Sequence, residues 1–172
     1  MKTALKMLAV LFILFLLVGS GLPARWEVSR STVIGAPAGE IHPYLEDFRA
    51  WQQWMPWGVE RDPSVRTTYS GAERGPGAVT SWTSEKDGPG TMEITASDPA
   101  RGVWYDLNLE FGLVKGAFLY EARAAGTTVT WWSAGDNGWN LAGRWMGLLM
   151  DGMLGADMEQ GLAALQGLFD SD

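Results

Sequence analysis

The chain contains no cysteine, and this absence removes several kinds of site at once. Disulfides, thiol nucleophiles, thiolate metal ligands and a lipid-modified cysteine are all excluded. The single histidine, His42, excludes metal sites built from several histidines. Basic residues are also few, because 13 Lys and Arg stand against 20 Asp and Glu, for a net charge of −7. Such an acidic chain is a poor match for nucleic acid, whose phosphates select clustered Lys and Arg.

What is present is an ordinary globular composition with one unusual number. Hydrophobic residues make up 47% of the 172 residues and charged residues 19%, values that exclude a disordered or fibrous chain. Ten of the residues are Trp. We find no internal repeat and no pattern that calls for a cofactor or a metal, so we predict one domain without either.

The N-terminus carries a separate segment. Lys2 and Lys6 precede an uncharged apolar run over residues 7–22 that is interrupted only by small residues near its end. This order is typical of a secretory signal or an N-terminal anchor, and the run is near the lower limit of about 17 residues for crossing a bilayer. We therefore divide the chain into residues 1–24, the anchor or signal, and residues 25–172, the domain.

Cleavage of this segment stays open in the sequence. Val18 and Ser20 form a small-residue cleavage pattern, whereas Pro23 suits a turn that leaves a membrane. An uncleaved anchor gives a cytoplasmic-membrane protein with a single pass through residues 7–22. A cleaved signal gives a secreted or periplasmic protein. In both cases the basic end predicts that the domain lies outside the cytoplasm.

The pattern of the domain predicts strands first and a long helix last. Residues 26–34 favour a strand, residues 38–45 and 48–54 favour two short helices, and apolar residues then alternate with polar ones from residue 65. Turn signals about every ten residues predict an antiparallel meander. Residues 141–169 have helical spacing, with Asn140 as N-cap and a bend at Gly152 and Gly155.

This helix should pack an apolar stripe on the concave side of the sheet, which makes the fold class α+β. The predicted stripe consists of Trp145, Leu149, Met153, Leu162 and Leu165.

Several stretches, in their order and spacing, resemble the polyketide cyclase/dehydrase-type branch of the SRPBCC (START and Bet v 1-like) superfamily. They are residues 28–37, 47–57, 62–63, 69–71, 75–78, 128–131, 150–157 and 161–165, with Trp82. The resemblance implies a helix-grip fold, in which a curved antiparallel sheet of about seven strands surrounds the long C-terminal helix, with two short helices after the first strand. It also implies a cavity between sheet and helix, but no particular reaction.

The sequence offers no complete catalytic constellation. His42 has no identified nucleophile partner, and we expect it at the surface or at a helix cap. Asp151 and Asp157 could act as a pair of acids, but helix capping or contact with an arginine is the expectation we favour.

Large apolar side chains are the candidates for lining a cavity. Each of them has two interpretations, plain core packing or a wall of a ligand pocket. The full candidate set is Arg30, Trp54, Trp57, Trp82, Tyr105, Trp131, Met146, Met150 and Met153.

Arg30 is the unusual member of this set. By alternation it shares the inward face of its strand with Val28 and Ile34. A buried guanidinium needs a partner, either an acidic side chain of the protein or the carboxylate or phosphate of a ligand.

Three functions remain, in order of preference. The first is binding of a small apolar, lipid-like or polyketide-like ligand by an exported, membrane-tethered domain. The second is an interaction or structural domain whose cavity is filled by its own side chains, and the third is a cyclase or aromatase-type enzyme. The oligomeric state is not readable from the sequence.

Overall fold

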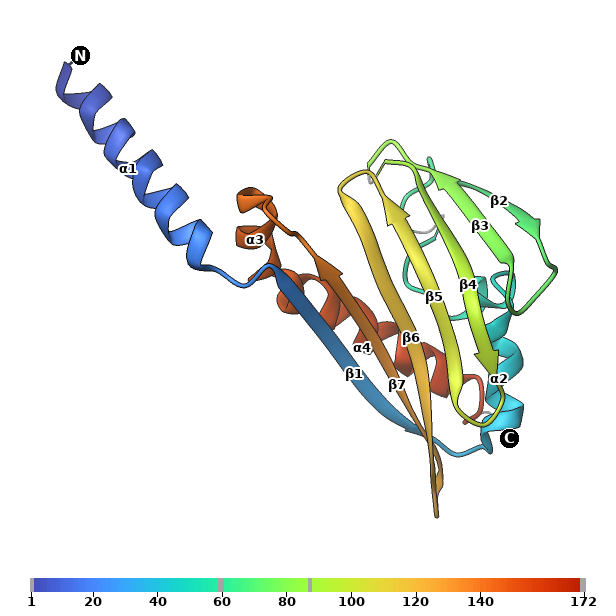
Figure 1. Ribbon diagram of the computed structural model, residues 1–172. Helices are drawn as coiled ribbons and strands as arrows, with labels where there is room; N and C mark the ends of the chain where they lie inside the picture. Colours follow the sequence, from blue (N-terminus) through green and yellow to red (C-terminus); the bar gives the residue numbers. More distant parts are fainter. Residues whose placement is uncertain (1, 59–60, 87, 171–172) are drawn as a thin grey trace.

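The computed structural model describes residues 2–58, 61–86 and 88–170. It is α+β, with a seven-stranded sheet, a long C-terminal helix and an N-terminal helix that projects from the domain (Figure 1). The elements in chain order are α1 (Lys2–Gly21), β1 (Arg25–Ile34), α2 (Ala38–Glu46), η1 (Ala50–Gln53), β2 (Arg66–Gly71), β3 (Ala78–Thr83), β4 (Gly90–Asp98), β5 (Gly102–Leu109), β6 (Gly112–Arg123), β7 (Gly126–Asp136), α3 (Leu141–Gly147) and α4 (Met150–Gly167).

Strands β2 to β7 form a meander, and β1 pairs with β7 at one edge of the sheet. All neighbours are antiparallel, in the order β1-β7-β6-β5-β4-β3-β2, so β1 and β2 are the edges. The register from Trp26↔Gly135 to Ile34↔Thr127 sets the even-numbered residues of β1 on the concave face. The predicted first strand, the meander and the inward parity of Arg30 are confirmed.

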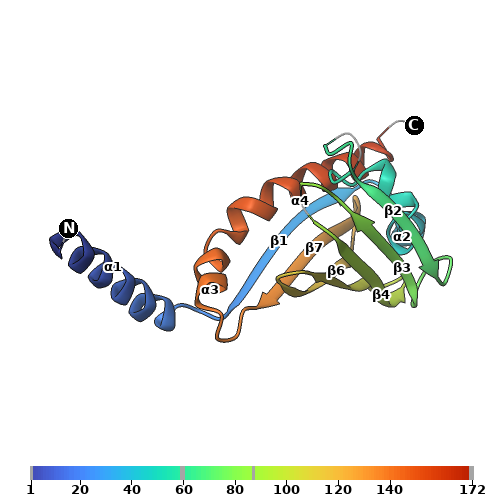
Figure 2. The same cartoon turned by 90° about the horizontal axis from the view of Figure 1, so that it is seen from above.

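Two helical elements cover the concave face of this sheet. Helix α4 runs along β1 and β7, and α2 closes the other end against β5 and β6 (Figure 2). Met158, Leu162 and Leu165 of α4 are buried against the strands. The second predicted short helix, over residues 48–54, is the 3₁₀ turn η1.

Close ring packing accompanies the curvature of the sheet. The ring of Tyr105 lies over Gly116 of the neighbouring strand, where an added Cβ would come within 2.1 Å of the ring. Trp82 lies over Gly90 in the same way. Glycine in a strand lets another group approach the backbone closely, and a ring that covers it restores the lost packing. Large aromatic rings therefore lie flat on the concave face.

The long C-terminal helix is divided, and the division is not where the glycines predict it. Asn140 does cap α3, because its side chain accepts a hydrogen bond from the Gly143 N–H at 3.0 Å. The break lies at Leu148 and Leu149, however, and α4 continues through Gly152 and Gly155. Helix α3 packs on α1 while α4 packs on β1, so the chain changes direction between these two partners.

The apolar stripe predicted for this region is correct only in its second half. Leu162 and Leu165 face the sheet, but Leu149 and Met153 are exposed. Trp145 packs against α1, where its ring stacks on Phe15 with centroids 5.4 Å apart. The stripe fails because its first half has a different neighbour from its second half.

Candidate functional site

The space between the sheet and α4 is occupied by aromatic rings. We define the aromatic cluster as Trp51, Trp54, Tyr105, Phe118 and Trp131. Two of its members come from η1 and the turn that follows it, and three from β5, β6 and β7. Each is at most 5% exposed. This is where the sequence predicts a cavity.

Phe118 lies at the centre of the aromatic cluster. Its ring centroid is 5.2 Å from that of Trp131, 5.4 Å from Trp51, 5.5 Å from Trp54 and 5.8 Å from Tyr105. Such tilted and edge-to-face contacts are the favoured arrangements of ring pairs. Phe118 was not among the predicted lining residues, although alternation along its strand places it on the inward face.

Trp51 and Trp54 are fixed by hydrogen bonds to α2. The indole of Trp51 donates to the Leu45 carbonyl at 3.0 Å, and that of Trp54 donates to the Tyr44 carbonyl at 3.1 Å. Both acceptors lie in the last turn of α2, where carbonyls lack partners within the helix. These two indoles thus provide donors for carbonyls at the C-terminal end of α2, and their rings also pack in the core.

The polar atoms of the strand residues are also paired. The Trp131 indole donates to the hydroxyl of Tyr105 at 2.8 Å, and both atoms are buried. Burial raises the pKa of Tyr105 to about 12, because the phenolate would be poorly solvated there. Tyr105 is therefore neutral at physiological pH.

The rim of the aromatic cluster is formed by Trp57, which is 37% exposed. Its ring lies 5.5 Å from that of Trp131, and its indole donates to Asp157 of α4 at 2.7 Å. Arg61 donates to the same carboxylate oxygen at 2.8 Å. One carboxylate thus holds Trp57 and Arg61 against α4. Contact of Asp157 with an arginine agrees with the sequence-based expectation.

Arg30 lies beside this region, on β1, between two carboxylates of α4. Its guanidinium contacts Asp151 at 2.9 Å and Glu159 at 2.6 Å. These hydrogen bonds raise the pKa of Arg30 and lower that of Asp151. Gly155 makes room for the contact, since a Cβ there would come within 2.1 Å of Arg30 Nη2. Of the two interpretations of Arg30, the structure has the pairing with acidic side chains.

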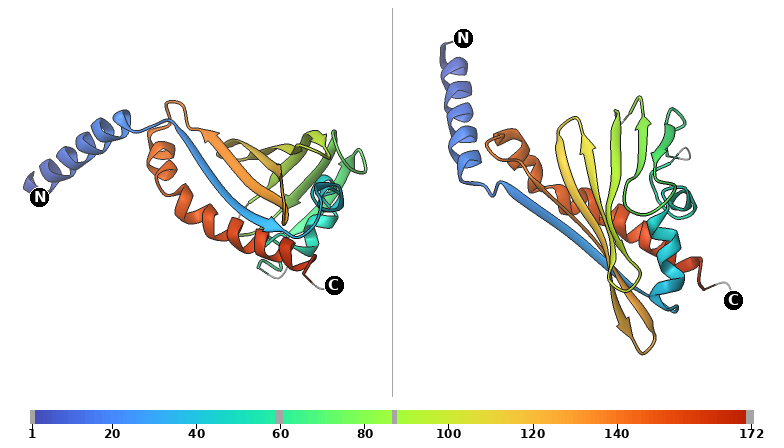
Figure 3. Two further views of the ribbon diagram at one scale, coloured as in Figure 1. Left: turned by 90° about the horizontal axis from the view of Figure 1, so that it is seen from below. Right: turned by 45° about the vertical axis from the view of Figure 1, so that its right-hand side comes forward.

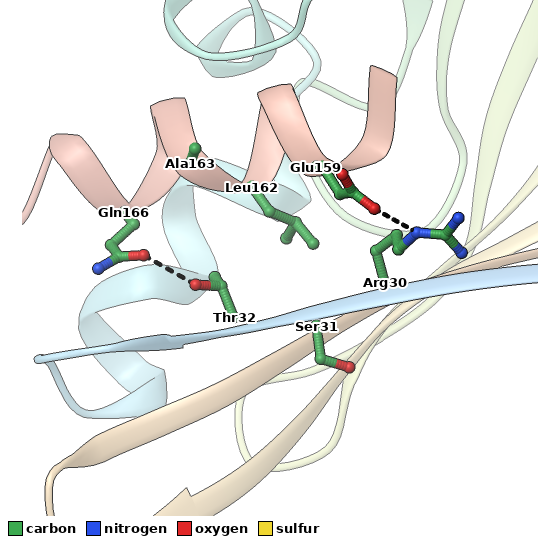
Figure 4. Close-up of a pocket in the computed structure, with 7 residues that line it drawn as sticks. All are labelled: Arg30, Ser31, Thr32, Glu159, Leu162, Ala163 and Gln166. Carbon is green, nitrogen blue, oxygen red and sulfur yellow. Dashed lines mark hydrogen bonds and ion pairs between the residues drawn. The ribbon is translucent and has the colours of Figure 1, made fainter. Parts of the chain in front are cut away.

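A groove follows the seam between β1 and α4 (Figure 4). It measures about 320 Å³ and opens to solvent. Leu162 points from α4 toward β1, with the Arg30–Glu159 ion pair on one side and a hydrogen bond from Thr32 to Gln166, at 2.7 Å, on the other. The groove therefore has an apolar centre between two polar contacts that join α4 to the edge strand.

The other predicted lining residues are dispersed. Met150 is partly buried against the core, and Trp82 is partly buried on β3 over Gly90. Met146 and Met153 are exposed and do not face the concave side, contrary to the prediction. They belong to the part of the apolar stripe that does not pack on the sheet.

His42 is buried rather than at the surface, which corrects the sequence-based expectation. Its Nδ1 lies 3.1 Å from the Tyr120 hydroxyl, and its Nε2 lies 3.0 Å from Ser97 Oγ and 3.3 Å from Glu46 Oε2. These partners come from α2, β4 and β6, so His42 joins α2 to the sheet. The sequence gives no signal for the contacts with Ser97 and Tyr120, which lie 55 and 78 residues away in the chain.

The sequence model of the family described as "Polyketide cyclase / dehydrase and lipid transport" matches residues 25–170. No curated protein matches the chain significantly. A solution structure from Thermobifida fusca superposes with a TM-score of 0.63 at 21% identity, covering 83% of this chain and 92% of that one. A Chromobacterium violaceum protein, CV1439, has a TM-score of 0.59 at 11% identity, covering 85% and 99%.

A third similar structure is that of Ara h 8.0201, with a TM-score of 0.56 at 14% identity, covering 86% of this chain and 99% of that one. These likenesses show that the domain has the helix-grip fold.

Proposed function

Because the chain belongs to the polyketide cyclase/dehydrase and lipid transport family, we propose that it is a membrane-anchored domain that binds a small apolar ligand at the aromatic cluster. The observation that carries this proposal is the convergence of five rings on the concave face, between the sheet and α4. Concave sites lined by aromatic side chains with few polar groups suit apolar molecules.

In this proposal the ligand reaches the aromatic cluster past Trp57. Unlike the aromatic cluster, it is partly exposed, and its ring covers Trp131. A ligand that displaces Trp57 reaches the faces of Trp131 and Trp54. Burial of about 200 Å² of apolar ligand surface contributes about 5 kcal/mol before the cost of association, so we expect weak, micromolar binding.

The test is a ligand titration of the full-length protein in lipid nanodiscs, with empty nanodiscs as the blank. Oleate and a polycyclic aromatic hydrocarbon serve as probes, and native mass spectrometry counts the bound molecules. We expect saturable binding by the wild type and an altered affinity for Trp57→Ala, which opens space beside Trp131. Trp104→Ala is the matched control, because Trp104 lies on the outer face of β5 and makes none of these ring contacts. Binding equal to that of the empty nanodiscs would refute the proposal.

One observation favours a second candidate. The ring contacts of 5.2–5.9 Å within the aromatic cluster fill the interior with the protein's own side chains, as an interaction domain without a ligand would. In that case, none of the probes binds and the Trp57→Ala variant acquires no binding either.

The anchor is the second part of the proposal. Helix α1 is apolar, with a mean hydropathy of 2.3, and it is long enough to cross a bilayer. Its contacts with the domain support retention of the helix, since the buried Arg144 donates to the Ser20 and Leu22 carbonyls at its end. Cleavage before Leu22 would remove the first of these acceptors.

The basic start of α1 supports a domain outside the cytoplasm, since Lys2 and Lys6 stay on the cytoplasmic side. A C-terminal alkaline phosphatase fusion should be active, and a fluorescent reporter that matures only in the cytoplasm should be dark. The opposite pair of results would contradict this orientation.

A further inference from the structure

An apolar surface remains exposed at the end of the domain that carries α3. From Trp139 to Met150 the only charged side chain is Arg144, which is buried. We define the α3 face as the exposed residues Trp139, Met146, Leu148, Leu149 and Met153. Trp139 is 86% exposed. Several large apolar side chains exposed within one short stretch of chain are typical of an interaction site.

The α3 face has a fixed position relative to α1. The ring of Trp145 stacks on Phe15, and Gly19 lies so close that a Cβ there would be 2.9 Å from the Trp145 indole nitrogen. Arg144 adds hydrogen bonds of 2.8 and 3.2 Å to the carbonyls of Ser20 and Leu22. Figures 1 and 3 show α3 beside the last turns of α1.

The length of α1 sets the depth of these contacts. Its 20 residues extend over about 30 Å, which equals the thickness of the hydrocarbon core. Phe15 lies six residues before Gly21, about 9 Å along the helix axis. If α1 crosses the bilayer, a ring that stacks on Phe15 lies within the membrane boundary and not in bulk water.

We infer that α3 lies in the interfacial region of the bilayer that α1 crosses, with the α3 face in contact with lipid. This inference rests on the proposed anchor. The α3 face carries an exposed Trp, as suits the boundary between headgroups and acyl chains. The one exposed carboxylate between its members, Asp151, is paired with Arg30 at 2.9 Å. The domain is thus attached at two points and held at a fixed tilt.

A neighbouring turn points to the same conclusion. The pairing of Val114 with Gly135 brings the start of β6 next to the end of β7, which leads into α3. Phe111, in the turn that precedes β6, is 71% exposed. Another exposed aromatic ring therefore lies at the end of the sheet from which the chain enters α3.

The absence of cysteine makes the test direct, because one introduced thiol can be labelled with an environment-sensitive fluorophore. The full-length protein is reconstituted in phosphatidylcholine vesicles that contain nitroxide-labelled lipids. Leu149→Cys and Met146→Cys report on α3, and Phe12→Cys reports on α1. Val33→Cys is the control, because Val33 is also an exposed apolar residue but lies at the other end of β1.

We expect nitroxides close to the headgroups to quench the probes at Leu149 and Met146, and to leave the probe at Val33 bright. Quenching at Phe12 without quenching at Leu149 and Met146 would overturn this inference and leave the anchor intact. Loss of quenching at Phe12 would instead overturn the anchor. Probes on α3 that escape both the nitroxides and aqueous iodide would assign the α3 face to a second protein copy, which also overturns the inference.

Discussion

Gly161 is the residue at which α4 meets the aromatic cluster. A Cβ at this position would lie 2.9 Å from Trp131 and 3.1 Å from Pro56. Gly152 is in the same helix, but a Cβ there meets nothing within 4 Å. Glycine thus has a packing role at one position of α4 and none at the other.

We therefore predict opposite effects for two identical substitutions. Gly161→Ala should lower the free energy of unfolding by about 1–3 kcal/mol, because it overpacks the interior. Gly152→Ala should raise it by about 0.5–1 kcal/mol, because alanine is the better helix former. Denaturant unfolding measures both. Equal effects would show that α4 does not approach Trp131 as described.

Asp62 links the segment before β2 to the end of β3. Its carboxylate accepts hydrogen bonds from the hydroxyls of Ser84 and Ser64 and from the Ser64 N–H. These bonds lower the pKa of Asp62 to about 2, from its usual 3.8. A carboxyl group with a lowered pKa in the folded state stabilises the protein above its unfolded pKa, and this contribution disappears as the pH falls.

The pH dependence of stability should reveal this contribution. The difference in thermal midpoint between the wild type and Asp62→Asn should be constant above pH 4 to 5 and should shrink as the pH falls toward about 2. Asp170→Asn, at the exposed end of the chain, provides the comparison. A difference that does not change with pH would mean that the ionised carboxylate is not what stabilises this loop.

At the scale of the elements, α4 presents its second half to the sheet. Leu162 is 2% exposed, whereas Met153 of the same helix is 56% exposed. Leu162→Ala should cost about 2–5 kcal/mol of stability, because it leaves a cavity at the seam with β1. Met153→Ala should change stability by no more than about 0.5 kcal/mol. If the two variants unfold alike in denaturant, the assignment of the buried face of α4 is wrong.

The sequence was a good guide to the strands and a weaker guide to the helices. Alternation has a period of two, and it assigned the inward face of β1 correctly, including Arg30. Helical spacing identified the apolar face of residues 141–169 but not the neighbour of that face. Leu149 and Leu162 are equally apolar, but Leu149 lies at the break between α3 and α4 and is exposed, whereas Leu162 is buried.

The candidate site was predictable to a similar extent. Trp54, Tyr105 and Trp131 were expected on the concave side and lie there together, buried. Phe118 was missed as their common neighbour. An acidic partner for Arg30 was one of two interpretations, and contact with an arginine was one of the expectations for Asp151, but the pairing of these two residues was not predicted, because they lie 121 residues apart. Long-range pairs of this kind leave no spacing signal in the chain.

At the scale of the whole molecule, Arg144 joins α1 to the domain. It donates to two carbonyls at the end of α1 and to the Gly138 carbonyl before α3. The last carbonyls of a helix have no acceptor role inside it, so a donor from elsewhere stabilises that end. Arg144 therefore acts together with Trp145, which stacks on Phe15, to hold α1 against the domain.

Loss of this side chain should loosen the connection. In nanodiscs, Arg144→Gln should increase the rate of trypsin cleavage after Arg25, at the start of β1, severalfold, because the segment between α1 and β1 is no longer held. Arg101→Gln, in the turn before β5, is the control and should leave that rate unchanged. Equal rates for both variants would show that α1 and the domain are joined by other contacts.

The aromatic cluster also gives the molecule an optical property. The indoles of Trp57 and Trp54 lie 5.5 and 5.9 Å from that of Trp131, at interplanar angles of 66° and 79°. Chromophores that are fixed this close and this steeply inclined have coupled electronic transitions, which produce paired bands of opposite sign in circular dichroism. The near-ultraviolet spectrum is also the signal that disappears when side chains lose their fixed packing. Any molecule that moves Trp57 would therefore change the spectrum of the unlabelled protein.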